Sequence, residues 1–456
     1  MELKCGIVFA STITMATTAV AAPKEDSKPN IIIIFCDDLG YGDLACFGHP
    51  TIKTPYLDQL AAEGQKWSSF YVSASVSSPS RAGLLTGRLG VRTGLYGNRI
   101  RVLYPKSKLG IPDEELTIAE ILKDNGYATG CVGKWHLGHK SEGMPLAHGF
   151  DYFYGAPFSN DMSRKEQALD GNPNYPYDYI IYEQDEIVER ELDQTTLTKK
   201  VNDKAIAFIE DNIDKPFFLY LAHPMPHWPV YAAEEFQGRS ARGPYGDCIE
   251  ELDYRVGEII QTLERNGLDD NTLVVFTSDN GPWLTYKSLG GSAGPLSEGK
   301  AAIMEGGFRV PCIMWGDMVK PAHITDMGST LDLLPTICDI ADIEVPNDRE
   351  YDGVSLKNVL EERTASNRDE VFYFRNDFLY AMRKGDYKIL FAYKTGYGRD
   401  PREEFEIPRL YNIAQDPEER YEISAENPEI VKELTEYAEA YKASLDIKSP
   451  LFDVLD

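Results

Sequence analysis

Cysteine is scarce in this sequence and never occurs in a closely spaced pair. The 456 residues include seven cysteines, and no two of them form a C-x-x-C motif. Several lie inside apolar runs such as "IIIIFC" and "VPCIMW". We therefore expect buried free thiols and see no sign of a disulfide framework.

Positive charge is also in short supply. Lysine and arginine number 46 against 73 aspartates and glutamates, which gives a net charge of −27. Because nucleic acid is itself a polyanion, such an acidic surface argues against nucleic acid as a partner. An anionic small substrate is still compatible with this charge, but it would require a local basic pocket.

Internal repeats and low-complexity tracts are absent, and one segment resembles a targeting leader. The N-terminal apolar stretch 5–20 follows Lys4 and ends near an A-x-A site at 19–21. We predict a signal peptide over residues 1–21 and a periplasmic or secreted mature protein. A membrane anchor is the weaker alternative, because the segment is short and lacks a strong stop-transfer flank. We expect no stable membrane insertion.

The rest of the chain alternates apolar runs with amphipathic helical patterns. The strand-length runs are 31–35, 127–133, 217–222, 273–278 and 310–315. Strands that are apolar throughout and alternate with helices predict an α/β fold with a large mixed, mostly parallel sheet sandwiched by helices. Near residue 345 the pattern changes to aromatic-rich strands, a Lys-Gly-Asp turn and a long final helix. We predict a catalytic domain over 22–345 and a smaller α+β domain over 346–456 with an antiparallel sheet.

Acidic side chains follow two of the apolar runs directly. Asp37 and Asp38 follow "IIIIFC", and Asp279 and Asn280 follow "LVVFTS". In open α/β sheets, ligands bind at the carboxyl ends of the strands. Hard oxygen donors gathered there would suit Ca²⁺ or Mg²⁺ better than Zn²⁺. Taken singly, each Asp could equally be a turn or cap residue.

Two histidine patterns need separate treatment. His223 and His227 have the spacing of a helical zinc pair, but the intervening prolines forbid a helix there. Lys134 and His136 follow the run at 127–133, where a closely spaced Lys and His more often face a site than pack structurally. His139 is expected to be structural or peripheral.

The stretch "SVSSPSRAGLLTGR", residues 75–88, reads as the start of a helix. Serine can cap, and proline fits the first turn. A helix N-terminus offers free N–H groups and partial positive charge to an oxyanion. Arg81 in the first turn opposes the helix dipole, which suggests that it serves something other than the helix.

The same stretch resembles the sulfatase signature, C/S-x-P-S-R followed by L-T-G-R. The segments "DDLGYGD", "GKWHLG", "PHWP", "SDNGP", "GGSAGPLSEGK" and "EGGFRVP" follow in the family's order. The chain is thus similar to formylglycine-dependent type I sulfatases of the alkaline phosphatase superfamily. It is nearest to the branch of arylsulfatase A and N-acetylgalactosamine-6-sulfatase, and to bacterial members with serine at the key position.

The resemblance implies that Ser77 is converted to Cα-formylglycine by a sulfatase-maturing radical enzyme that accepts serine. It also implies a Ca²⁺ held by Asp37, Asp38, Asp279 and Asn280, with residue 77 completing the shell. Two alternatives stay open at this point. Ser77 could remain unmodified, or it could replace an original cysteine and leave the enzyme inactive.

The remaining roles come from the same resemblance. Arg81, Lys134 and Lys300 would surround the sulfate as cations. His227 would give a proton to the leaving sugar oxygen. One hydroxyl of the hydrated aldehyde would attack sulfur, and His136 would take the proton of the second, which expels sulfate and restores the aldehyde.

Two further segments are candidates for substrate contact. Arg99 and Arg101 lie in the basic stretch "GNRIRVLYPKSK" and could steer an anionic glycan to the pocket. The tyrosine-rich stretch 170–186 could line the sugar site or form an edge hairpin, and both interpretations are equally compatible with its sequence.

The expected function is removal of O-sulfate from a sulfated mono- or oligosaccharide, with galactose or N-acetylgalactosamine 6-sulfate favoured. One alternative is a phosphate ester hydrolase of the same superfamily that uses unmodified Ser77. Another is a non-catalytic protein that binds sulfated glycans.

Overall fold

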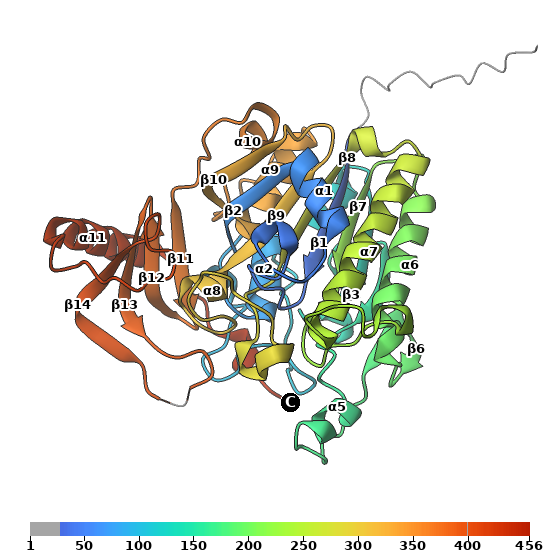
Figure 1. The fold of residues 1–456 in the computed structure, drawn as a ribbon, viewed down its shortest axis with the longest axis horizontal. Coiled ribbons are helices and arrows are strands. Elements are labelled where there is room, and N and C mark those ends of the chain that lie inside the picture. The colour runs from blue at the N-terminus through green and yellow to red at the C-terminus, as the bar shows by residue number, and fades with distance from the viewer. Residues whose placement is uncertain (1–27, 399) are drawn as a thin grey trace, which may run out of the picture.

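The computed structural model describes residues 28–398 and 400–456. The segment predicted to be a signal peptide, residues 1–21, lies outside the described residues. Among those described, no helix is long and apolar enough to cross a membrane. Figure 1 shows a large sheet covered by helices, beside a smaller sheet formed by the C-terminal part of the chain.

The large sheet has ten strands in the order β10-β2-β9-β8-β1-β7-β3-β4-β5-β6. Its five central strands, β8 to β4 in that order, are parallel, and the strands β9, β5 and β6 pair antiparallel toward the edges. The strand bounds are β1 Asn30–Cys36, β2 Gln65–Tyr71, β3 Ala128–Lys134, β4 Tyr152–Ala156, β5 Ile180–Glu183, β6 Glu186–Arg190, β7 Phe217–Ala222, β8 Thr272–Ser278, β9 Arg309–Trp315 and β10 Ala322–Ser329. The predicted large, mostly parallel mixed sheet is confirmed.

The central strand β1 shows why the sheet needs helices on both faces. Ile31 and Ile33 pack into one core cluster, whereas Ile32 and Ile34 pack into another. Successive side chains of a strand point to opposite faces, so an all-apolar strand must be covered on both. Helices α2, α4 and α9 cover the first face, and α1, α6 and α7 cover the second.

The helices fall between the strands, as the alternating pattern of the sequence predicts. Thr117 accepts the backbone N–H of Glu120 in a capping box that starts α4. The helix bounds are α1 Pro55–Glu63, α2 Ser77–Thr86, α3 Gly90–Thr93, α4 Ile118–Asp124, α5 Arg164–Leu169, α6 Leu197–Glu210, α7 Pro244–Arg265, α8 Glu305–Phe308, α9 Leu333–Ile340, α10 Lys357–Glu362 and α11 Pro428–Ser444. The tyrosine-rich stretch contributes β5, which pairs with β6 as an edge hairpin.

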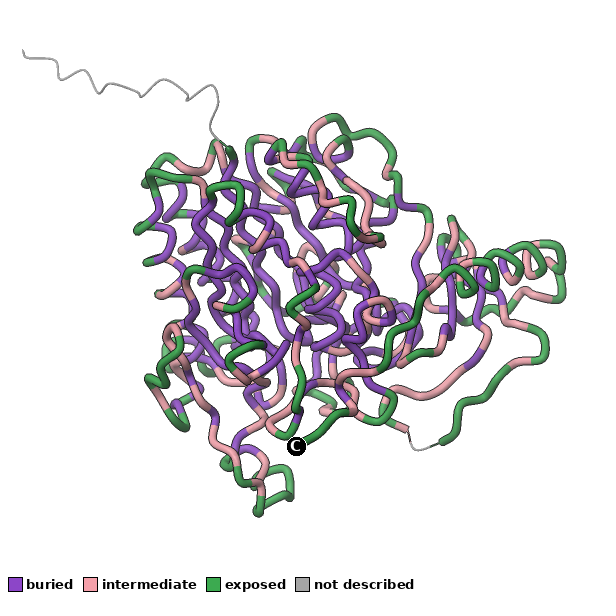
Figure 2. Tube along the Cα trace, turned by 180° about the vertical axis from the view of Figure 1, so that it is seen from behind, coloured by how far each residue is buried: buried purple, intermediate pink, exposed green. Residues whose placement is uncertain are grey.

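The small sheet is antiparallel, with strand order β11-β12-β13-β14. Its strands are β11 Glu370–Arg375, β12 Phe378–Lys384, β13 Tyr387–Tyr393 and β14 Glu403–Asn412, and the Lys-Gly-Asp turn joins β12 to β13 as predicted. Leu434 and Ala438 of α11 pack on this sheet. Figure 2 shows that a smaller part of this domain is buried than of the large one, with much of α11 exposed.

The six cysteines among the described residues are free, as expected. Five of them are buried and Cys46 is half-buried.

Candidate active site

The predicted acidic cluster forms where β1 and β8 end side by side. These strands are parallel neighbours, with Cys36 opposite Ser278, so Asp37 and Asp38 leave the sheet beside Asp279 and Asn280. All four side chains are buried. The backbone N–H of Asp38 donates to Asp279 Oδ1 at 3.1 Å. Asp38 adopts a left-handed φ of 65°, a strained conformation of the kind that clusters at functional sites.

Ser77 stands at the first position of α2 and faces this cluster. Its Oγ donates to Asp37 Oδ1 at 3.1 Å and accepts a hydrogen bond from Lys134 Nζ at 3.2 Å. The helix start is where the sequence places it, but Val76 occupies the cap position and no serine caps it. The neighbouring Ser78 hydroxyl instead accepts from the N–H of Leu103. The Ser77 hydroxyl therefore contacts the acidic cluster and does not cap the helix.

Three cations neutralise the carboxylates. Arg81 donates to Asp279 Oδ2 through Nε at 3.1 Å and Nη2 at 2.8 Å. Lys134 Nζ lies 2.6 Å from Asp37 Oδ2. Lys300 Nζ lies 2.8 Å from the Asp38 carboxylate. The opposition of Arg81 to the helix dipole is therefore offset by its pairing with a carboxylate buried beneath the helix.

Burial and these cations set the charge of the two adjacent carboxylates in opposite directions. Burial alone would raise the pKa of Asp37, but Lys134 and Arg81 lower it to about 2. Burial raises the pKa of Asp38 to about 7, although Lys300 opposes the change. Asp37 is thus a firmly ionised anion, whereas Asp38 needs more positive charge than the protein supplies to ionise fully.

His136 is held as a neutral base. Its Nε2 lies 2.8 Å from the carbonyl oxygen of Leu103, so Nε2 carries the proton and donates it. Nδ1 is buried and has no hydrogen-bond partner among the described residues. Burial, and next the charge of Lys134, hold the pKa of His136 well below its usual range. Nδ1 is therefore an unprotonated nitrogen with a free lone pair.

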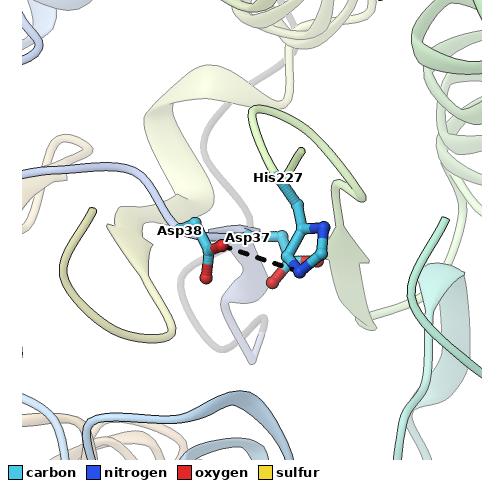
Figure 3. A group of neighbouring side chains, drawn as sticks. All are labelled: Asp37, Asp38 and His227. Atoms are coloured by element: carbon cyan, nitrogen blue, oxygen red, sulfur yellow. Dashed lines mark ion pairs between the residues drawn. The ribbon is translucent and has the colours of Figure 1, made fainter. Parts of the chain in front are cut away.

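His227 has the opposite tautomer. Its Nδ1 lies 2.5 Å from the carbonyl of Trp228 and 3.0 Å from Asn160 Oδ1, two acceptors that fix the proton on Nδ1. Nε2 faces the Asp38 carboxylate at 3.6 Å, as Figure 3 shows. No helix forms around the prolines at 224 and 226, as the sequence predicts.

The side chains present fit a hard divalent cation. Ligand atoms of Asp37, Asp38 and His227 lie within 4.8 Å of one another (Figure 3). Asn280 Nδ2 donates to Asp38 Oδ1 at 2.7 Å, while its Oδ1 is buried without a hydrogen-bond partner in the described chain. An orphaned carbonyl oxygen beside three carboxylates is a donor set that Ca²⁺ prefers.

The two arginines predicted to contact substrate, Arg99 and Arg101, have different surroundings. The guanidinium of Arg101 lies 5.0 Å from the ring centre of Tyr397 and lines a cleft beside the site. Arg99 is exposed, and its side chain donates to the carbonyl of Asp453 at 3.0 Å. His139 is half-buried against Phe158, consistent with the peripheral role expected for it.

Sequence reasoning missed an aromatic wall beside the cations. Trp283 stacks with Tyr397 at 5.5 Å, and Trp228 stacks with Tyr286 at 4.3 Å. Lys300 Nζ lies 4.2 Å from the centre of the Trp283 ring. Trp283 and Tyr286 belong to one segment, but Trp228 and Tyr397 come from distant parts of the chain, so no spacing in the sequence indicates that the four meet.

Comparisons with known proteins show the family of this chain. A family model described as Sulfatase matches residues 29–343, and one described as C-terminal region of aryl-sulfatase matches 366–456. The chain belongs to the sulfatase family. It is a sulfuric ester hydrolase of the type I group, in the alkaline phosphatase superfamily.

Three similar proteins indicate the range of this sulfatase's relatives. Human arylsulfatase A is 38% identical, over 94% of this chain and 90% of its own length. N-acetylgalactosamine-6-sulfatase of Canis lupus familiaris is 34% identical, over 97% and 91%. The crystal structure of Ps i-CgsB in complex with k-i-k-neocarrahexaose has a TM-score of 0.79 at 29% identity, covering 93% of this chain and 94% of that one.

Proposed function

We propose that this sulfatase removes O-sulfate from a sulfated carbohydrate, using a formylglycine derived from Ser77 beside a bound Ca²⁺. The observation that supports it most is the position of Ser77 Oγ. It lies 3.1 Å from Asp37 and 3.2 Å from Lys134, inside a buried cluster of carboxylates and cations. A sulfate ester is an anion that resists nucleophiles, so its attack requires such a concentration of positive charge.

The proposed reaction requires two groups that the encoded polypeptide does not supply, a Ca²⁺ ion and an aldehyde at residue 77. Asp37, Asp38, Asp279 and Asn280 would hold the Ca²⁺, which would supply positive charge beside the sulfate oxygens. A hydrated aldehyde at residue 77 would supply one hydroxyl for attack and a second that can lose a proton.

The chain's own residues bind and orient the sulfate. Lys134 and Lys300 each have an ammonium group at the edge of the cluster, next to Ser77 and Asp38 respectively. Arg81 is bound to Asp279, so its main contribution is to hold that carboxylate and the helix in register. Fixed positive groups in a water-excluded site stabilise developing negative charge more strongly than mobile ones do.

The two histidines divide the proton transfers. Nε2 of His227 is the nitrogen that faces the cluster, so a proton on it can pass to the departing sugar oxygen. Nδ1 of His136 has a free lone pair and no competing donor among the described residues, so it can accept the proton that residue 77 must lose. His136 can act as a base as it stands, whereas His227, whose neutral ring carries its proton on Nδ1, must first gain a proton on Nε2 to act as the acid.

The carbohydrate substrate is supported by the aromatic wall and by the relatives. Rings such as Trp283 beside Lys300 provide apolar faces on which a sugar can pack. Galactose or N-acetylgalactosamine 6-sulfate is the proposed class, in view of the similarity to N-acetylgalactosamine-6-sulfatase. We further propose export to the periplasm or exterior, and maturation of Ser77 by a radical enzyme.

A substrate screen tests the proposal. Matured protein is assayed against sulfated monosaccharides and disaccharides, against the matching phosphate esters, and with Ser77→Ala as the control. The proposal expects turnover of 6-sulfated galactose or N-acetylgalactosamine and none with Ser77→Ala. Preference for the phosphate esters, tight binding without turnover, or full activity of Ser77→Ala would each contradict it.

A further inference from the structure

A cleft lies between the loop that precedes α2 and the small C-terminal sheet. Its lining includes Ser75 and Val76, directly before Ser77, and Ala301, directly after Lys300. From the opposite side, Arg375 at the end of β11 completes it, and Arg101 lies between. The cleft therefore extends from residues adjacent to Ser77 and Lys300 to the C-terminal sheet.

The two arginines of this cleft have no carboxylate partner within the described chain. Arg375 donates only to the carbonyl oxygens of Lys394, Thr395 and Gly396, at 3.0 to 3.3 Å. Arg101 forms a cation–π contact with Tyr397 and no ion pair. Neither guanidinium charge is therefore balanced by an ion pair among the described residues.

Their charges are close enough to repel. Burial lowers the pKa of Arg375, and the charge of Arg101 lowers it further. Glu298 opposes this effect, but its carboxylate accepts a hydrogen bond from Tyr393 and forms no ion pair with Arg375. Repulsion between like charges costs free energy unless an anion lies between them. The cleft is thus built to gain stability when a negative group binds.

A continuous series of ring contacts connects this pair to the sulfate site. His227 lies 5.0 Å from Trp283, and Trp283 lies 5.5 Å from Tyr397, measured between ring centres. Arg101 then lies 5.0 Å from the Tyr397 ring. The Trp283 Nε1–H is buried and has no acceptor among the described residues. A sugar chain lying along these rings would reach both ends.

We propose that Arg101 and Arg375 form a second anion subsite, which selects substrates with a further negative group beyond the sulfate that is removed. This inference rests on the proposed function and adds to it the substrate class: a carbohydrate with a second sulfate or a carboxylate on a neighbouring sugar. Guanidinium groups bind both oxyanions through paired N–H donors. The small sheet thereby supplies a substrate contact.

Matched substrates separate this subsite from the sulfate site. Kinetic constants are measured for a singly sulfated disaccharide, a disulfated one and one with a uronic acid carboxylate. Arg101→Ala should raise KM about tenfold for one or both doubly charged substrates, with kcat unchanged and the singly charged substrate unaffected. Arg375→Lys keeps the positive charge but loses the paired N–H donors of the guanidinium group. It should therefore raise the same KM by a smaller factor than Arg101→Ala does. The two doubly charged substrates show whether sulfate or carboxylate is preferred.

The control variant is Lys432→Ala, which removes an exposed positive charge from α11, a helix that contributes no residue to the lining of the cleft. It should leave all three substrates unchanged. An equal effect of Arg101→Ala on singly and doubly charged substrates, or no effect on any, would overturn the subsite.

Binding to Ser77→Ala protein, measured by calorimetry with the same disaccharides, distinguishes this failure from failure of the proposed function. If the wild type turns over none of the substrates, but Arg101→Ala selectively weakens the binding of doubly charged ligands, sulfate hydrolysis is refuted and the subsite is supported. Equal binding of singly and doubly charged ligands to Ser77→Ala protein would refute the subsite alone.

Discussion

Replacing Glu305 with glutamine should loosen the contact that joins the two sheets. Glu305 starts α8, five residues after Lys300, and is completely buried. Its carboxylate accepts hydrogen bonds from Tyr71 at 2.7 Å and Tyr373 at 2.6 Å, and Lys388 Nζ lies 3.2 Å away. Tyr71 belongs to the large sheet, and the other two partners belong to the small one. One carboxylate thus holds both sheets beside the site.

The size of the effect follows from the pKa of this carboxyl group. Burial alone would raise the pKa, but Lys388 and the neighbouring arginines lower it from 4.5 to about 2. A shift of this size corresponds to ~3 kcal/mol of stability from the ionised form. Because the pKa is depressed on folding, this stability is present above pH 4.5 and is lost as the pH falls toward 2.

A second glutamate, Glu419, contacts the same lysine, but its pKa is shifted in the opposite direction. Glu419→Gln therefore serves as the matched control. Glu419 Oε1 lies 2.8 Å from Lys388 Nζ, yet burial raises the pKa of Glu419 to about 7. Its ionised form is therefore disfavoured, and its contribution to stability decreases as the pH rises from 4.5 through 7. Glu305→Gln lets Glu419 ionise more readily, so ~3 kcal/mol is an upper bound for the loss.

Thermal unfolding of both variants between pH 5 and 8 measures the effect. Glu305→Gln should lower the melting temperature by about 2–4 °C for each kcal/mol lost, the range for large domains. Glu419→Gln should cost less, and at pH 8 it should be neutral or stabilising. Equal losses in the two variants, or an unchanged melting temperature for Glu305→Gln at pH 7, would refute this account of the contact.

Three further predictions concern the site. His136→Ala should lower kcat by about 10²–10⁴ with little change in KM, measured by initial rates, because the base for residue 77 is lost; an unchanged kcat would contradict that role. Removal of divalent cations by a chelator should abolish activity and lower the melting temperature, and Ca²⁺ should restore both; a chelated enzyme with full activity would rule out the metal. Arg81→Lys should lower kcat/KM at least about tenfold, because a lysine cannot make the paired donation to Asp279; a wild-type value would refute this.

Much of the fold is predictable because the strands are apolar throughout. The run "IIIIF" is buried on both faces, which only a central strand of a covered sheet allows. The order of the strands in the sheet is not predictable in this way. β1 pairs with β7 and β8, which lie about 190 and 240 residues further along the chain, and no local pattern encodes that pairing.

The residues of the site also differ in how far the sequence predicts them. Side chains that directly follow buried strands, such as Asp37 and Asp279, are predictable from position alone. The left-handed backbone of Asp38 and His136 is not, because the tertiary contacts around these residues impose it. Arg375, at the end of β11, and Trp283, three residues after Asn280, come near Tyr397 and Arg101 only through tertiary contacts that no local sequence pattern encodes.

Mass spectrometry of the peptide that contains residue 77, combined with turnover measured on the same protein, tests the central claim most directly. Conversion of the serine to formylglycine removes two hydrogens, a loss of about two mass units. Sulfate release should rise in proportion to the converted fraction. Full sulfate release by protein whose residue 77 is entirely unmodified serine would contradict it.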